Sequence, residues 1–342
     1  MKKLKQIAAF VVAGVMVASL TACNQVGGWI MKAEDESLEI PVGVYINNLY
    51  NEYWTARYSV SDTSSSPLGQ TIEEKNGEQW IKDAALEDTE KIFAVLNMCR
   101  EKEISLTEEE ITSVQSSTNS TWDNYGENYE KMGVSKDSIQ FLGEYNKLSD
   151  KLFQSIYGAG GSSAVTDAEA KEYFEENFVS FKYISVPLTN DSGTEFSQED
   201  KDKVKVNLQE YLDSYLGGKK TFNEIVADYN AEHSNATVKG QELITDLTTN
   251  TSIADEIKDA VKETEAGNGT IVTYNKTMYL ILKYDITKES SYLKDNKSTV
   301  LYAMRGEEFT NTVEEAVKAV KYTLNDRAID KYSPSWIESL GF

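Results

Sequence analysis

Few side chains in this sequence could do chemistry, and they do not form a common catalytic motif. His233 is the only histidine and directly follows Glu232. A histidine beside a carboxylate could serve as a general base or a metal ligand, but no second ligand stands at helical spacing from this pair. The sequence also contains no phosphate-binding loop, nucleophile elbow or CxxC pair. We therefore expect a solvated loop at His233, no metal and no cofactor.

The other residue with chemical potential is Cys23, which follows a secretory signal. Three lysines precede an apolar run from Ile7 to Leu20, which is shorter than the roughly 20 residues that span a bilayer. The sequence Leu20-Thr21-Ala22-Cys23 resembles the lipobox of bacterial lipoproteins. The resemblance implies that residues 1–22 are a lipoprotein signal peptide. It also implies that lipid on Cys23 anchors the chain at the extracytoplasmic face of the bacterial cell membrane.

Composition narrows the function classes. The 342 residues carry a formal net charge of −22, which opposes binding to nucleic acid and favours basic partners. With Cys23 lipidated, Cys99 has no partner for an intrachain disulfide, so packed cores must supply the stability. The 20 tyrosines argue against a largely disordered chain. The length suits two domains, or one domain interrupted by another.

The first half of the mature chain has helical periodicity. Residues 23–40 are polar, include Glu34-Asp35-Glu36, and are expected to form a tether. Residues 41–160 are expected to form an N-terminal helical domain, because apolar residues recur there at three- and four-residue steps. Thr107 and Glu110 have the spacing of a capping box and should begin one of its helices.

A Gly/Ser-rich segment at 158–163 then predicts a linker. Residues 166–286 are expected to form a compact α+β domain with a small antiparallel sheet. Its predicted elements are a helix to 177, a strand at 178–186, helices at 197–216 and 221–230, a strand at 238–244, a helix at 253–261, and a hairpin at 267–285. The C-terminal residues 287–342 predict helices that pack on the N-terminal domain, giving an α+β fold in which a helical domain is interrupted.

The order of these elements looks like a parvulin-type peptidyl-prolyl isomerase domain. Short matches support it at 166–174, 221–229, 239–243 and 266–269. The complete layout, from the lipobox to the returning C-terminal helix, resembles the PrsA-like extracytoplasmic foldase lipoproteins and their SurA-like periplasmic relatives.

This resemblance implies a proline-binding pocket with a histidine on the first strand and another on the last. Tyr183 and Tyr279 stand at those positions, and Glu232 at the position of a nearby acid. These three residues are the candidate catalytic residues. Isomerisation needs selective binding of the twisted amide rather than proton transfer, so tyrosines do not rule it out. The alternative is that both tyrosines simply pack within the sheet.

The resemblance implies a chaperone or foldase whose partners are unfolded or newly exported polypeptides. Tyr45, Trp54, Trp80 and Trp122 are candidates for an apolar client-binding surface, with core packing as the alternative. A homodimer is left open. The alternative function is a solute-binding lipoprotein of a transporter, a class that normally needs two α/β lobes.

Overall fold

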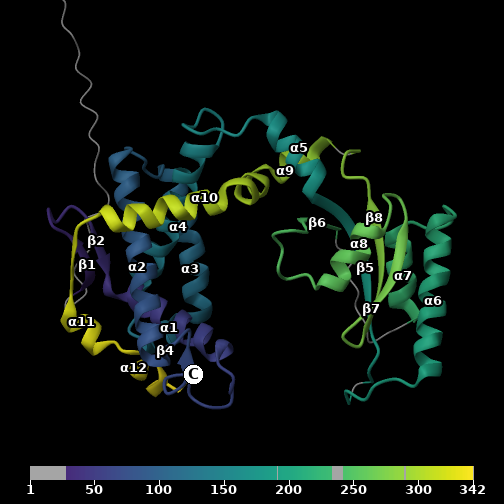
Figure 1. Cartoon of the computed structure of the whole chain (residues 1–342), viewed down its shortest axis with the longest axis horizontal. Helices are drawn as coiled ribbons and strands as arrows, with labels where there is room; N and C mark the ends of the chain where they lie inside the picture. The colour runs from purple at the N-terminus through teal and green to yellow at the C-terminus, as the bar shows by residue number, and fades with distance from the viewer. Residues whose placement is uncertain (1–27, 191, 233–241, 289, 342) are drawn as a thin grey trace, which may run out of the picture. The chain divides into compact units, whose positions relative to one another are not determined.

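The computed structural model describes residues 28–190, 192–232, 242–288 and 290–341. The chain divides into two compact units (Figure 1). Unit 1 contains the residues up to Ile156 together with those from Glu308 onward, and unit 2 runs from Tyr157 to Glu307. Cys23, the expected signal peptide and His233 lie outside the described residues.

Four long helices form most of unit 1. They are α1 (Val42–Ser59), α2 (Gly77–Glu101), α3 (Glu108–Lys131) and α4 (Lys136–Tyr157). The capping box predicted at Thr107 and Glu110 is present and begins α3. The helices pack on a core whose largest fully buried side chains include Tyr45, Phe93, Leu49, Ile81 and Leu152. The predicted helical periodicity is therefore confirmed, since the apolar stripes of these helices face this core.

The C-terminal part of the chain completes unit 1. Its elements are α10 (Lys297–Ala319), β9 (Tyr322–Leu324), α11 (Asp326–Lys331) and α12 (Pro334–Ser339). The rings of Phe153 and Phe309 meet edge to face, with centroids 5.4 Å apart, and α12 packs on α1. The prediction that the C-terminal helices pack on the N-terminal ones is confirmed. The second division between the units falls within α10, between Glu307 and Glu308, rather than at residue 286. The helix α10 therefore contributes residues to both units.

The tether prediction for residues 23–40 is wrong for its described part. β1 (Trp29–Ala33) and β2 (Glu39–Pro41) pair antiparallel, and β9 pairs with the other edge of β1. Ile30, Met31 and Ile40 are fully buried. The acidic cluster lies at the turn between the two strands, where it reaches solvent. A separate two-stranded hairpin, β3 (Thr71–Ile72) and β4 (Lys75–Asn76), precedes α2.

Unit 2 is an α+β unit with one four-stranded sheet. The first elements are α5 (Asp167–Asn177), β5 (Phe178–Pro187), α6 (Gln198–Leu216) and α7 (Phe222–Glu232). They are followed by β6 (Glu242–Asp246), α8 (Asp255–Glu263), β7 (Gly269–Tyr274), β8 (Thr277–Tyr284) and α9 (Ser290–Asp295). The strand order is β6-β5-β8-β7, and all neighbours are antiparallel. Element order and types therefore follow the prediction, and residues 238–241 of the strand expected at 238–244 lie outside the described residues.

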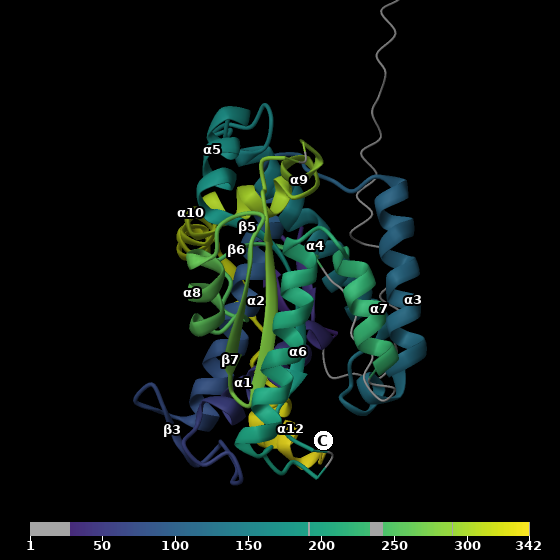
Figure 2. The same ribbon diagram turned by 90° about the vertical axis from the view of Figure 1, so that its right-hand side faces the viewer.

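The sheet of unit 2 has two different faces, and side chains alternate between them. One face packs on the long helices α6 and α7 and is named here the α6 face; it includes Ile184, Leu280 and Leu282. The other packs on the short helix α8 and is named the α8 face; it includes Phe181 and Ile281. Figures 1 and 2 show α8 on the opposite side of the strands from α6 and α7.

No helix in the described residues is long and apolar enough to cross a bilayer.

Candidate functional site

Tyr183 and Tyr279 come together on the α8 face. Tyr183 lies on β5 and Tyr279 on β8, where Tyr183 pairs with Ile281 and Ser185 with Tyr279. The two tyrosines are thus diagonal neighbours on adjacent strands, and diagonal neighbours remain within reach of aromatic side chains. Their ring centroids lie 6.1 Å apart at an interplanar angle of 55°. The structure therefore places two of the three candidate catalytic residues side by side.

The α8 face is only partly covered. α8 has 9 residues, whereas α6 alone has 19, so the shorter helix covers a smaller part of the sheet. The buried centre of this face consists of Phe181, Leu247, Ile257, Val261 and Ile281. Half-buried apolar side chains surround this centre: Val179, Tyr183, Leu243, Ile253, Ala254, Ala260, Val272, Tyr274 and Tyr279. The result is a buried apolar centre surrounded by half-buried apolar and aromatic side chains.

The structure does not bring Glu232 to the tyrosine pair. Glu232 is the last residue of α7, on the opposite side of the sheet, and its Oε2 accepts a hydrogen bond of 2.7 Å from the Tyr211 hydroxyl. Burial, followed by this carboxylate, raises the pKa of Tyr211. The bond joins α6 to the last residue of α7, which is a structural role. The order of elements in the sequence could not reveal on which side of the sheet Glu232 lies, because that depends on how α7 packs against the strands.

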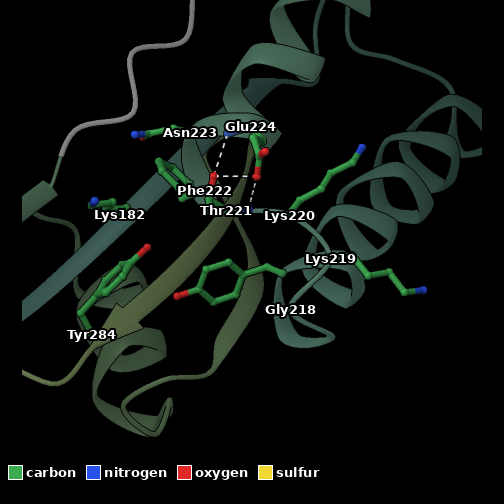
Figure 3. Close-up of a pocket in the computed structure, with 10 residues that line it drawn as sticks. Lys182, Gly218, Lys219, Lys220, Thr221, Phe222, Asn223, Glu224 and Tyr284 are labelled. Carbon is green, nitrogen blue, oxygen red and sulfur yellow. Dashed lines mark hydrogen bonds between the residues drawn. The ribbon is translucent and has the colours of Figure 1, made fainter.

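A pocket of about 420 Å³ opens at the end of the α6 face (Figure 3). Its walls come from β5, β8, the end of α6, the connection that follows it and the start of α7. The wall residues are Lys182, Tyr215, Gly218, Lys219, Lys220, Thr221, Phe222, Asn223, Glu224 and Tyr284. The rings of Tyr215 and Tyr284 meet edge to face at 6.5 Å, and Lys182 Nζ lies 5.1 Å from the centre of the Tyr284 ring. No sequence pattern predicts this pocket, because its residues come from three separate segments.

The lysines of this pocket do not form an anion site. Lys219 and Lys220 point away from Tyr284 (Figure 3), and Lys220 forms an ion pair with Asp228. The amide of Glu224 at the start of α7 already donates to Thr221 Oγ1, and the Glu224 carboxylate accepts from the Thr221 amide at 2.7 Å. This capping box occupies the helix N-terminus, where an anion would otherwise bind.

Cys99 and the client-contact candidate Tyr45 are core residues. The Cys99 thiol is buried, its Sγ lies 3.5 Å from the carbonyl oxygen of Leu148, and burial raises its pKa to about 11. A thiol that stays protonated is a poor nucleophile. Tyr45 is fully buried, so it cannot contact a client. Among the described residues, no group of three potential metal ligands comes together.

The remaining aromatic candidates are half-buried. Trp54 lies between Tyr50 and Tyr58 on α1, with centroid distances of 6.3 and 6.2 Å. Trp80 donates to Glu73 at 3.0 Å. Trp122 stacks on Tyr129 along α3. These three side chains lie on three different helices.

Comparison with known proteins found similarity at the level of structure. No family model and no curated protein sequence matches the chain. Foldase protein PrsA from Streptococcus pneumoniae is 17% identical over 77% of this chain and 95% of its own, with a TM-score of 0.40. The Lactococcus lactis PrsA foldase is 14% identical over 90% and 98%, with a TM-score of 0.38. A structure from Campylobacter jejuni, described with PEB4 and Cj1289 as SurA-like chaperones, is 10% identical over 87% and 99%, with a TM-score of 0.26. The chain is thus similar in structure to PrsA foldases and SurA-like chaperones over most of its length, at low sequence identity.

Proposed function

We propose that this protein is a membrane-anchored extracytoplasmic chaperone or foldase that binds unfolded or newly exported polypeptides. The observation that carries the proposal is the α8 face of unit 2, where apolar and aromatic side chains are only half-buried. Unfolded chains expose apolar side chains that folded proteins bury, and an uncovered apolar surface offers them a reversible contact. Tyr183 and Tyr279 are among the half-buried side chains that would make this contact.

The N-terminal sequence and the charge support the same role. Lipid on Cys23 would hold the chain where exported polypeptides emerge. The net charge of −22 would keep the protein soluble while it binds apolar segments, and would attract basic clients at low ionic strength.

Holding of clients is proposed as the main activity, and prolyl isomerisation as a weak one. The two tyrosines offer hydroxyl groups and flat apolar rings to a bound proline, and they lie 6.1 Å apart. Neither is an imidazole, and Glu232 is directed to Tyr211 on the other side of the sheet. Binding of the twisted amide would therefore rely on shape and on single hydrogen bonds.

The transporter alternative receives less support. Solute-binding proteins of that class use two lobes of alternating strands and helices. In the described residues every strand pair is antiparallel, and the four-stranded sheet lies in unit 2 alone. This architecture does not offer two equivalent lobes around a solute.

Aggregation of an unfolded client tests the proposal. The chain from Asn24 onward, added in equimolar amounts, should delay the rise of light scattering when a chemically unfolded client is diluted into buffer. A folded acidic protein of similar charge serves as the control for non-specific electrostatic effects. Equal scattering with both proteins would contradict the proposal.

A further inference from the structure

Unit 1 contains a cleft of about 610 Å³ between α1, α3 and α4 that is separate from the proposed client surface. Its walls are mainly hydroxyl and amide side chains: Asn47, Asn51, Ser113, Ser117, Thr118, Thr121 and Asn146. Val114, Ile139, Leu142 and Gly143 supply apolar contacts, and Tyr129 lies at the same cleft. Side chains of the first kind both donate and accept hydrogen bonds. The cleft therefore suits a ligand that is itself rich in groups of both kinds.

The cleft is close to neutral in a strongly acidic chain. Its only ionisable wall residues besides Tyr129 are Lys147 and Asp150, whose formal charges cancel. Along α3, no residue from Ile111 to Trp122 is charged, although the whole chain carries −22. A neutral wall gives no electrostatic attraction to a charged ligand. It also binds no counter-ions that would compete with an uncharged ligand for the cleft. The local composition thus favours an uncharged ligand.

Thr118 presents an unused hydroxyl at this cleft. Only 4% of the residue is exposed, and it lines the cleft wall. Elsewhere on α3, Thr112 and Ser120 bond their hydroxyls to the carbonyl oxygens four residues earlier. Within the part of the chain that the structure describes, the Thr118 hydroxyl has no such bond. Its oxygen is accessible at the cleft wall, and a ligand hydroxyl there would bond to it.

Flat aromatic rings stand beside the polar wall. Tyr129 and Trp122 stack with centroids 6.1 Å apart and an interplanar angle of 10°. Gly126 allows this arrangement, because a Cβ at that position would lie 2.9 Å from Trp122 Nε1. Gly126 thus leaves the room that the Trp122 ring needs. Such a ring offers an apolar plane to the apolar face of a sugar.

We propose that this cleft binds an uncharged oligosaccharide. A pyranose ring carries hydroxyls that both donate and accept, together with an apolar face, which matches the hydroxyl and amide wall and the aromatic plane. Peptides are usually recognised by a sheet edge or by deep apolar pockets for side-chain anchors. This cleft is formed by three helices and has a mainly polar wall, so a glycan is the better match. The proposal is independent of client binding on the α8 face.

Calorimetric titration of the chain from Asn24 onward tests the proposal. The probes are the uncharged tetramers of N-acetylglucosamine and of glucose, with an unstructured peptide of Ser, Asn, Gly and Leu as the comparison. We expect saturable binding of at least one sugar and none of the peptide. No saturable binding of either sugar, or saturable binding of the peptide alone, would overturn the proposal; the second result would assign the cleft to polypeptide.

Two variants in the cleft wall and one control variant outside it test whether the sugar binds in the cleft. Ser117→Trp should fill the cleft and abolish sugar binding, whereas Asn119→Trp, an exposed position of the same helix outside the cleft wall, should leave it unchanged. Thr118→Val keeps the side-chain shape and removes the hydroxyl, so sugar affinity should fall about five- to tenfold without a lower melting temperature. Equal affinities for the two tryptophan variants, or an unchanged affinity in Thr118→Val, would overturn the assignment. Aggregation assays with Ser117→Trp test the chaperone role by itself. A failure of the oligosaccharide proposal can therefore be told apart from a failure of the chaperone proposal.

Discussion

At the scale of single residues, the tyrosine pair of unit 2 is proposed to bind clients well and to catalyse isomerisation only weakly. Tyr183 and Tyr279 stand where the parvulin resemblance implies histidines, and the fold brings their rings to 6.1 Å. The sequence predicted both positions because strand type and element order fixed them. Glu232 is different: it lies at a helix end on the other side of the sheet, and no pattern in the sequence records that direction.

Histidines in place of Tyr183 and Tyr279 should raise isomerase activity. We expect little prolyl isomerisation above background from the protein itself, and an increase of about tenfold for the double variant Tyr183→His and Tyr279→His. Tenfold corresponds to about 1.4 kcal/mol, which is the scale of one hydrogen bond. A proline-peptide assay measures it, and the Tyr183→Phe and Tyr279→Phe double variant is the control. High activity in the unchanged protein that disappears in the phenylalanine variant would show instead that the hydroxyls catalyse the reaction.

Asp246 should make the stability of unit 2 depend on acid pH. The residue is only 3% exposed. Burial alone would raise the pKa of its carboxyl, but hydrogen bonds from Thr248 and Tyr173 outweigh burial and hold this pKa below its usual value. The Tyr173 hydroxyl donates at 2.8 Å, and the Thr248 amide and hydroxyl donate at 2.7 and 2.6 Å.

Because the folded state lowers this pKa, the stabilisation is complete above the unfolded value near 4 and is lost as pH falls through the folded value. Asp246→Asn should cost about 1–3 kcal/mol at pH 7 and reduce the loss of stability between pH 4 and lower pH. Urea unfolding at pH 7 and pH 3 measures both effects. Asp259→Asn, at an exposed position of α8, should change little. If Asp246→Asn lost as much stability between pH 7 and pH 3 as the unchanged protein, other carboxyl groups would be responsible for the acid dependence.

At the scale of elements, the sequence predicted those features that depend on interactions between neighbouring residues. The capping box at Thr107 and the hairpin turn at Asn275 and Lys276 are each specified by a few neighbouring residues; both turn residues have positive φ, 41° and 60°. β1 and β2 were missed, although Trp29-Ile30-Met31 is apolar. β2 has three residues, and the second partner of β1 is β9, almost 300 residues further along the chain. Periodicity within a window cannot detect such a pairing.

Asn325 should stabilise the three-stranded sheet of β2, β1 and β9. Its Nδ2 donates to the Trp29 carbonyl at 2.9 Å, and its Oδ1 accepts from the Ala328 amide at the start of α11. Asn325→Ala removes both bonds and should lower the free energy of unfolding of unit 1 by about 1–2 kcal/mol. Asn325→Asp keeps the cap acceptor and should lose about half as much. Equal stability of all three proteins in denaturant would mean that solvent satisfies both groups.

At the scale of the whole molecule, the chain begins and ends in one unit and inserts the other between. The Tyr322 hydroxyl bonds to Glu90 and the Tyr53 hydroxyl to Glu338, so side chains far apart in sequence join within unit 1. The helical character, the inserted α+β unit and the return of the C-terminus could be predicted, because each follows from a long periodic segment or a Gly/Ser-rich break. The oligosaccharide cleft could not, since its wall combines three helices that only packing brings together.

The most direct test of the chaperone account is aggregation suppression by variants of the α8 face. We predict that the chain from Asn24 onward delays client aggregation, that the Tyr183→Ser and Tyr279→Ser double variant loses most of this delay, and that the Tyr183→Phe and Tyr279→Phe variant keeps it. The phenylalanines retain the apolar rings on which the contact depends. Circular dichroism must show the same fold for all three proteins. Full protection by a folded serine variant would contradict the account and move the client surface elsewhere.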